Sequence, residues 1–89
     1  MPVIIFTQNL KLHTDCPERT VSGTSVSEAL QNYFKEYPAV QGYLLDDQNR
    51  LRKHMQIAVN GVIIQDRINL TDPVQEMDEI FVVQALSGG

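Results

Sequence analysis

The residues best placed to do chemistry stand at the end of the chain, which closes with Leu86-Ser87-Gly88-Gly89. Two terminal glycines add little to a core, because ordering glycine costs more conformational entropy than ordering any other residue. A tail without side chains can instead enter a narrow channel, and from Leu86 to Gly89 it reaches about 10 Å. We therefore expect the terminal carboxylate of Gly89 to be a reactive group, with an inert tail as the alternative.

No other residues form a convincing catalytic centre. Cys16 is the single cysteine, so an internal disulfide is excluded, and nothing near it in sequence would lower its pKa. His13 and Cys16 lack the further ligands that a metal would need. Asp78 and Glu79 are adjacent, and adjacent side chains on a strand point to opposite faces. The hydroxyl groups of residues 22–27 are better explained as helix caps and turn residues. We predict no catalytic residue and no metal site.

The composition is that of one globular domain. The chain has 89 residues, a formal net charge of −4, 43% hydrophobic residues and 20% charged residues. An acidic chain is a poor candidate for binding a phosphate backbone, and we expect the basic cluster Arg50, Arg52 and Lys53 to be a solvated loop or strand edge. No apolar run approaches the roughly 20 residues of a membrane span, and the N-terminus does not resemble a signal peptide. We expect a cytoplasmic protein that binds neither nucleic acid nor membrane.

Hydrophobic periodicity predicts the elements that position the tail. Ser25 and Glu28 form a capping box that begins a helix with one apolar face, and Pro38 ends this helix. Asn60-Gly61 is a strong hairpin signal, because both residues tolerate positive φ. Alternating and β-branched segments predict strands at 3–7, 19–22, 54–59, 62–64 and 80–86. One helix on one face of such a sheet is an α+β fold.

The connections are less regular. Residues 14–18 are predicted to be a short turn, which would make the first two strands a β-hairpin. In the weakly patterned stretch 39–53, we expect a turn at Gln41-Gly42 and a short buried segment at 43–45. Residues 70–74 are predicted to be a turn with one helical turn.

The second half of the chain resembles the ThiS/MoaD family of sulfur carriers. The resemblance rests on Asn60-Gly61 and on three later stretches, which are Asp72-Pro73-Val74, 78–83 and 86–89. It implies a ubiquitin-like β-grasp fold, with a mixed four- to five-stranded sheet and one main helix on one face. Residues 1–86 would form the domain and 87–89 a flexible tail. The longer stretch 44–60 looks most like the carriers used in cysteine biosynthesis.

The resemblance also implies a mechanism. In such proteins a partner that resembles ubiquitin-activating enzymes uses ATP and Mg²⁺ to adenylate the terminal carboxylate, here that of Gly89. A sulfur donor then converts it to a thiocarboxylate, which delivers sulfur to a synthase of cysteine, molybdopterin, thiamine or related biosynthesis. A metalloprotease that trims the tail is a further implied partner. The carrier itself binds no cofactor and is not an enzyme.

The last strand and the tail would make the contacts with the partner. Gly88 and Ser87 would follow Gly89 into its active site, and Leu86, Phe81 and Val83 are the predicted docking residues. Phe81, Val83 and Ala85 alternate along the strand with Ile80, Val82, Gln84 and Leu86, and either set could face the helix. Two other functions remain open, which are a protein modifier conjugated through its C-terminal glycine and an interaction module with an inert tail.

Overall fold

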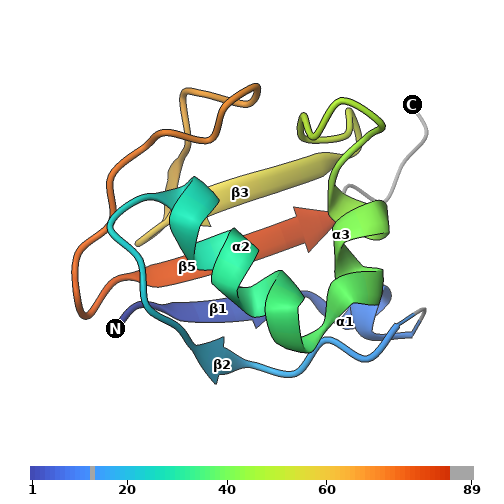
Figure 1. Ribbon diagram of the computed structural model, residues 1–89, viewed down its shortest axis with the longest axis horizontal. Helices are drawn as coiled ribbons and strands as arrows, with labels where there is room; N and C mark the ends of the chain where they lie inside the picture. Colours follow the sequence, from blue (N-terminus) through green and yellow to red (C-terminus); the bar gives the residue numbers. More distant parts are fainter. Residues whose placement is uncertain (13, 85–89) are drawn as a thin grey trace.

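Five strands form one mixed sheet whose central strand comes from the end of the chain (Figure 1). The computed structural model describes residues 1–12 and 14–84. The strand order is β2-β1-β5-β3-β4, in which β1 and β5 run parallel and the other neighbours are antiparallel. The strands are β1 (Val3–Phe6), β2 (Arg19–Thr20), β3 (Met55–Val59), β4 (Val62–Ile63) and β5 (Glu79–Gln84). The predicted α+β class is confirmed.

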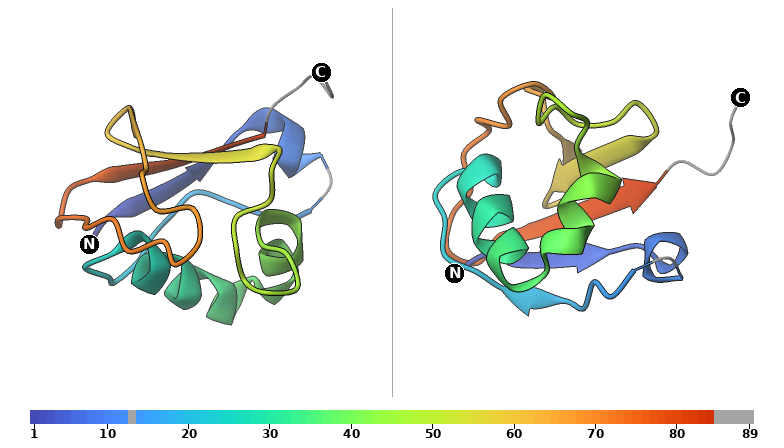
Figure 2. Two further views of the ribbon diagram at one scale, coloured as in Figure 1. Left: turned by 90° about the horizontal axis from the view of Figure 1, so that it is seen from above. Right: turned by 45° about the vertical axis from the view of Figure 1, so that its right-hand side comes forward.

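Helix α2 (Val26–Glu36) covers one face of this sheet, so that the fold has two layers (Figure 2). Half of the predicted capping box is confirmed, since the Ser25 hydroxyl accepts from the Glu28 backbone amide. The Glu28 carboxylate accepts from the backbone amide of Thr24, one residue before the cap, and not from that of Ser25. The predicted apolar face of α2 is buried. Within the described chain, no helix combines the length and the apolar character that crossing a membrane requires.

The predicted turn at Gln41-Gly42 is wrong, because these residues lie in the helix that follows α2, which is α3 (Pro38–Leu44). Pro38 ends α2 as expected, and it also begins α3. Proline suits the first position of a helix, since the amide that it lacks would have no intrahelical partner there. Val40 and Leu44, four residues apart on one face of α3, are both fully buried and fix the short helix against the core.

Two other connections differ from the predictions. A short helix, α1 (Gln8–Lys11), follows β1, so β1 and β2 pair without the tight hairpin turn that we expected. The buried side chain of Leu10 holds α1 at the end of the sheet. The helical turn predicted within 70–74 is absent. Pro73 instead forms a β-bridge with Ser25, and Leu70 has a positive φ of 56° that a helix would not permit.

An aromatic stack joins α2 to the sheet. The ring centroids of Phe6 and Tyr33 are 5.1 Å apart, and those of Tyr33 and Tyr37 are 5.0 Å apart. The Tyr33 hydroxyl donates a hydrogen bond to the Pro17 carbonyl oxygen at 2.7 Å, so the loop before β2 is tied to the helix. Burial of Tyr33 raises the pKa of its phenol, which stays protonated and keeps this hydrogen bond at physiological pH.

Asn60 ties the β3–β4 turn to the beginning of β5. The φ angles of Asn60 and Gly61, 51° and 85°, lie in the left-handed region that the turn needs. The Asn60 side chain donates to the Asp78 carboxylate at 2.8 Å and accepts from the Glu79 backbone amide at 2.9 Å. Hydrogen bonds from the Gln75 backbone amide and from Asn60 hold the pKa of the Asp78 carboxyl below its usual value. The turn and the start of β5 are therefore one hydrogen-bonded unit.

Asp66 organises the loop between β4 and β5. Its carboxylate accepts a hydrogen bond from the Thr71 hydroxyl at 2.6 Å and others from the backbone amides of Ile68, Asn69 and Thr71. These hydrogen bonds, that of the Thr71 hydroxyl above all, lower the pKa of the Asp66 carboxyl from 3.8 to about 2. In the same loop, the Leu70 carbonyl oxygen accepts a hydrogen bond from the Ser27 backbone amide. The loop therefore supports the first turn of α2.

We predict that Asn60→Asp destabilises the protein more than Asn60→Gly. Both variants permit a positive φ, and glycine only loses the two side-chain hydrogen bonds, at a cost of about 1–3 kcal/mol. Aspartate keeps an oxygen that can accept from the Glu79 amide, but it loses the donor to Asp78 and places a second carboxylate against the Asp78 carboxylate. Urea unfolding at neutral pH measures both variants. Equal stability of Asn60→Asp and the native chain would contradict the assigned hydrogen bonds.

We predict that the Asp66 loop makes stability depend on acid pH. Because the pKa of Asp66 is lower in the folded protein than in the unfolded chain, its contribution is complete above about pH 4 and is lost as the pH falls toward about 2. Asp66→Asn should therefore be less stable than the native chain at pH 7, with a difference that shrinks as the pH approaches 2. Urea unfolding across this range tests it, with Asp47→Asn, an exposed aspartate of another loop, as the control. A constant difference would contradict the prediction.

Candidate functional site

β5 is paired on both sides as far as Val82, and its last two residues are paired with β3 alone. β5 pairs in parallel with β1 from Val3↔Glu79 to Phe6↔Val82, and it pairs antiparallel with β3 from Met55↔Gln84 to Val59↔Ile80. From Ile80 to Val82, both edges of β5 are therefore paired with a neighbouring strand. Val83 and Gln84, its last two residues, are called the tail root here, because the rest of the chain follows them. The tail root has a defined position relative to the whole sheet.

The two sets of alternating residues on β5 now have assigned faces. Ile80 and Val82 are fully buried beneath the helix layer. Phe81 and Val83 lie on the opposite face of the sheet, where Phe81 is half-buried and Val83 is 36% exposed. The sequence left this choice open, because both sets are apolar. The predicted docking residues Phe81 and Val83 thus lie on the face that no helix covers.

An apolar row crosses this uncovered face, which we call the open face. Strand register places Ile5 of β1, Phe81 of β5, Ala58 of β3 and Ile63 of β4 side by side. Ile63 is 53% exposed, whereas Ala58 is nearly buried. The sequence analysis did not identify Ile5, Ala58 or Ile63 as site residues. Only the pairing register, which brings four distant segments together, could have shown that they continue the surface of Phe81.

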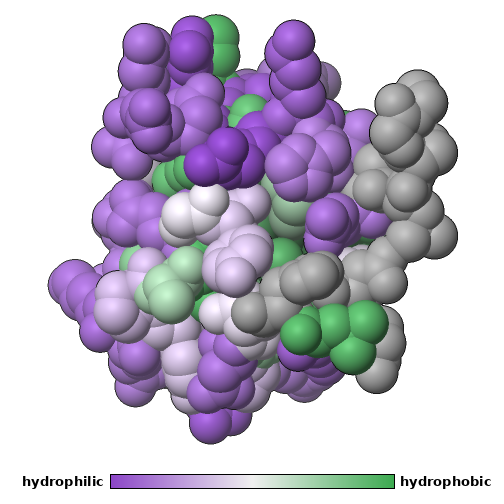
Figure 3. Space-filling view, turned by 90° about the vertical axis from the view of Figure 1, so that its right-hand side faces the viewer, coloured by the Kyte–Doolittle hydropathy of each residue, from purple (hydrophilic) through white to green (hydrophobic). Residues whose placement is uncertain are grey.

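Two segments flank the tail root, one on each side. The backbone amide of Thr7 donates to the Val82 carbonyl oxygen at 3.1 Å, and α1 follows directly. On the other side, a tight turn closed by the Met55 amide and the Arg52 carbonyl oxygen leads into β3. Figure 3 faces this end of the molecule, where most of the surface is hydrophilic and hydrophobic areas are small. The side-chain oxygens of Thr7 and Gln84 are buried here without a hydrogen-bond partner.

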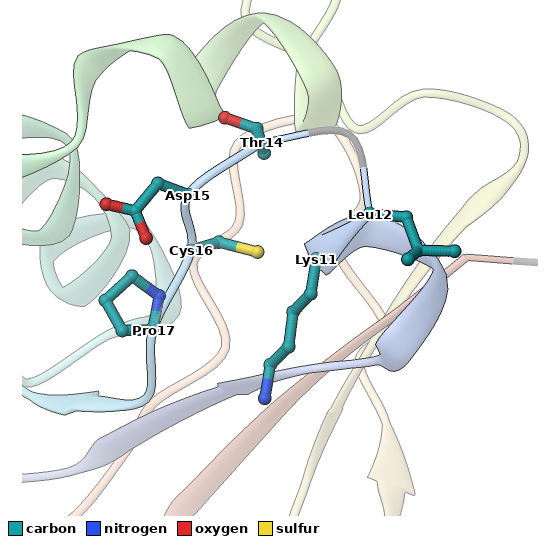
Figure 4. A pocket seen from close by; sticks show the side chains of 6 residues that line it. All are labelled: Lys11, Leu12, Thr14, Asp15, Cys16 and Pro17. Carbon is teal, nitrogen blue, oxygen red and sulfur yellow. The ribbon is translucent and has the colours of Figure 1, made fainter.

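Cys16 lies near this end, in the loop that follows α1 (Figure 4). Together with Lys11, Leu12, Thr14, Asp15 and Pro17, it lines an open hollow of about 420 Å³. The thiol itself is buried, with 2% of the residue exposed. Burial raises the pKa of the Cys16 thiol, an effect larger than that of nearby Lys11, which acts in the opposite direction. A thiol that stays protonated is a poor nucleophile, so Cys16 has a structural role.

The other candidates have structural explanations. The Ser25 hydroxyl caps α2, and Asp78 fixes the entry to β5. Glu79 is the first residue of β5, one position before the predicted start. His54 is exposed in the turn before β3. Over residues 1–12 and 14–84, no group of three or more His, Cys, Asp or Glu side chains is arranged to hold a metal ion.

The predicted tail lies beyond the part of the chain that the structure describes. Ser87, Gly88 and Gly89 lie there, and the predicted docking residue Leu86 and the candidate His13 are also outside the described residues. The structure therefore gives the position from which the tail starts and the surfaces around that position. The reactive group itself remains a prediction from the sequence.

Comparison with solved structures gives the same fold throughout. A chain of the BexX/CysO complex of Amycolatopsis orientalis is similar with a TM-score of 0.83 and 18% identity, over 100% of both chains. The solution structure of small archaeal modifier protein 1 (SAMP1) of Methanosarcina acetivorans gives 0.80 and 24%, over 99% of this chain and 95% of the other. CysO of Mycobacterium tuberculosis gives 0.81 and 17%, over 97% and 100%. No curated protein sequence matches the chain significantly.

The family comparison covers both the domain and its last residues. The sequence matches the ThiS family over residues 3–89, which includes every strand and helix described above and the terminal glycines. The five-stranded mixed sheet with its helix layer is the β-grasp architecture that the resemblance implied. The chain belongs to the ThiS family, the ubiquitin-like sulfur carriers, which are small β-grasp proteins and not enzymes.

Proposed function

We propose that the chain carries sulfur as a thiocarboxylate at Gly89. A partner enzyme transfers AMP from ATP to the terminal carboxylate and releases pyrophosphate. A sulfur donor then displaces AMP, so the C–O bond to AMP breaks and a C–S bond forms. The thiocarboxylate finally delivers its sulfur to a small acceptor in a biosynthetic pathway.

The chemistry explains why a partner is needed. A carboxylate is a poor electrophile, because attack adds charge to an anion and would expel oxide. The acyl-adenylate supplies a stable leaving group. ATP and Mg²⁺ would be bound by the partner, whose groups would stabilise the charge that develops during both steps. This chain would contribute the carboxylate, the bare tail that delivers it and the surface that holds the partner in place.

The observation that carries the proposal is the match to the ThiS family through Gly89, together with the fixed position of the tail root. A tail that starts from a central strand begins at one defined place, so its reach is measured from a rigid origin. The Gly-Gly ending has no side chain to obstruct a channel. Both features suit a group that must enter the active site of another protein.

The open face is the proposed docking surface for the activating enzyme. Phe81 and Val83 lie on it, and Leu86 would follow them toward the tail. The apolar row through Ile5 and Ile63 extends this surface across the sheet. Exposed apolar area of this kind marks partner sites.

For the pathway, we favour cysteine biosynthesis over molybdopterin, thiamine or a related product. The stretch 44–60, which includes part of α3 and all of β3, is the part that resembles carriers of that pathway. Similarity to two structures that carry the name CysO supports this choice. We further propose a cytoplasmic location, a sulfur-accepting synthase as the second partner, and a metalloprotease that trims the tail.

A protein modifier is the second candidate function. It is favoured by the similarity to two SAMP1 structures, those of Methanosarcina acetivorans and Haloferax volcanii, which are named as small archaeal modifier proteins. In this case the activated carboxyl of Gly89 would be joined to lysines of other proteins. Conjugates of high mass that disappear when Gly89 is deleted would identify the modifier. A thiocarboxylate without conjugates would identify the carrier.

We predict that the chain gains mass at Gly89 when it is incubated with the activating enzyme of the same organism, ATP and a sulfide source. The gain equals the difference between a sulfur and an oxygen atom, and fragmentation places it on the last residue. Gly88→Val should abolish the gain, because its side chain would obstruct the channel. Ser87→Ala is the matched control and should react like the native chain. A gain on any residue other than Gly89 would contradict the proposal.

We predict that Val83→Gln weakens docking on the activating enzyme. Exchanging this exposed valine for a polar side chain removes about 1 kcal/mol of apolar burial in the complex, so KM should rise about threefold to tenfold. Val62→Gln is the matched control, because Val62 is also an exposed valine of the sheet. Its neighbour Ile63 lies on the open face, so Val62 points to the opposite face. Equal effects of the two variants would rule out the open face as the docking surface.

A further inference from the structure

Five carboxylates gather at the end of the molecule where β1 and β5 begin. Backbone hydrogen bonds hold this end together, from Val3 to Asp78 and from Val26 to Asp72. The α-amino group of Met1 is the one basic group in the described segments 1–3, 21–28, 60–62 and 71–79, and it lies 3.8 Å from the Glu76 carboxylate. No Lys or Arg occurs in residues 1–3, 21–28, 60–62 or 71–79. The carboxylates belong to Glu28, Asp72, Glu76, Asp78 and Glu79.

The opposite end, around the tail root, carries cations. Lys11 lies in the last turn of α1, and Arg52 and Lys53 lie in the tight turn before β3, whose Met55 pairs with Gln84. Lys11 and Lys53 are exposed, and neither forms an ion pair within the described part of the chain. Arg52 donates to the Gly42 carbonyl oxygen at 3.0 Å. We call Lys11, Arg52 and Lys53 the basic rim.

Negative charge offsets the basic rim only in part. Asp15, in the loop after α1, is the one carboxylate in residues 8–12, 14–17 and 52–56. The neighbouring loop 46–50 contributes Asp46, Asp47 and Arg50, of which Asp46 and Arg50 form an ion pair at 3.5 Å. The net charge of −4 is therefore unevenly distributed, and the molecule is an electric dipole along β5 with its positive end at the tail root.

The setting of the basic rim favours a protein over a nucleic acid. Three cations are few for neutralising a phosphate backbone, and the acidic remainder of the chain would repel it. Exposed apolar side chains stand beside the cations, since Leu12 is 75% exposed next to Lys11, and Val83 is exposed on the tail root. Apolar contacts with a charged border are typical of protein interfaces.

We propose that the basic rim docks against an acidic surface around the channel that receives the tail in a protein partner. This inference rests on the proposed function for the identity of the partner, but not for the charge distribution. The positive end faces the partner, and the five carboxylates at the other end disfavour the reversed approach. The dipole thus orients the carrier with its tail toward the channel.

The scale of the molecule makes such orientation effective at close range. The six residues of β5 separate the two charged ends by about 20 Å. Charges are screened over about 8 Å at physiological ionic strength, so a partner that approaches one end experiences that end and little of the other. The basic rim therefore acts on the rate of association, and its effect fades as salt is added.

The test is a steady-state assay of ATP–pyrophosphate exchange with the activating enzyme of the same organism. At about 50 mM salt, Lys53→Glu and Lys11→Glu should each lower kcat/KM about threefold to tenfold with kcat unchanged, and the deficit should disappear near 0.5 M salt. Lys35→Glu, in the last turn of α2 and so in the helix layer, makes the same change in net charge outside the basic rim and should stay within about twofold of the native chain. Equal effects at Lys35 and Lys53, or none at either lysine of the basic rim, would overturn the proposal.

A second measurement separates this proposal from the proposed function. If the native chain supports no exchange, the sulfur-carrier function fails, and the basic rim is then tested alone by NMR titration with poly-glutamate at low salt. Amide shifts confined to Lys11, Leu12 and the turn at 52–54 would support it. Absent or scattered shifts, or tighter binding of an RNA oligonucleotide than of poly-glutamate, would overturn it.

Discussion

The pairing of β5 between β1 and β3 is the constraint on which the rest of the structure depends. β5 is the last strand in the chain, yet it occupies the centre of the sheet. Hydrogen bonds on both edges and the buried side chains of Ile80 and Val82 prevent it from shifting in register, because a shift by one residue would expose its core face. The tail root, the open face and the polarity of the molecule all take their positions from this strand.

Two parts of the sequence pattern, Asn60-Gly61 and Asp78-Glu79, are physically coupled in the structure. Asn60 and Asp78 are 18 residues apart in the sequence. In the structure, the Asn60 side chain forms hydrogen bonds with both Asp78 and Glu79. Sequence analysis could treat them only as separate signals for a turn and a strand entry. The network explains why asparagine in the turn serves the fold better than glycine would, since it also positions the start of β5.

Elements that have strong hydrophobic periodicity or a local capping or turn signal were predicted correctly. The α2 cap, the apolar face of α2 and the hairpin at Asn60-Gly61 are local patterns, and the structure confirms them. α3 was missed because its seven residues begin with a proline and contain Gly42, which lowers their helix propensity. The tertiary burial of Val40 and Leu44 stabilises this helix. The open face could not be predicted residue by residue, since strand register is a long-range property.

The account divides the work between a rigid domain and a bare tail. The helix layer buries one face of the sheet, which leaves the other face and the tail root for contact with a partner (Figure 2). Burial raises the pKa of the Cys16 thiol, the Ser25 hydroxyl caps α2, and the Asp66 carboxylate organises a loop, so these three groups have structural roles. The reactive group of the proposed function is the C-terminal carboxyl.

Its role is tested most directly by replacing that one group. A semisynthetic chain that ends in a Gly89 carboxamide keeps the fold, the tail and both surfaces but has no carboxylate to adenylate. With the activating enzyme and ATP, the account predicts that the native chain supports pyrophosphate exchange and the carboxamide does not, although it competes with the native chain for the enzyme. Exchange with the carboxamide at the native rate would contradict the central claim.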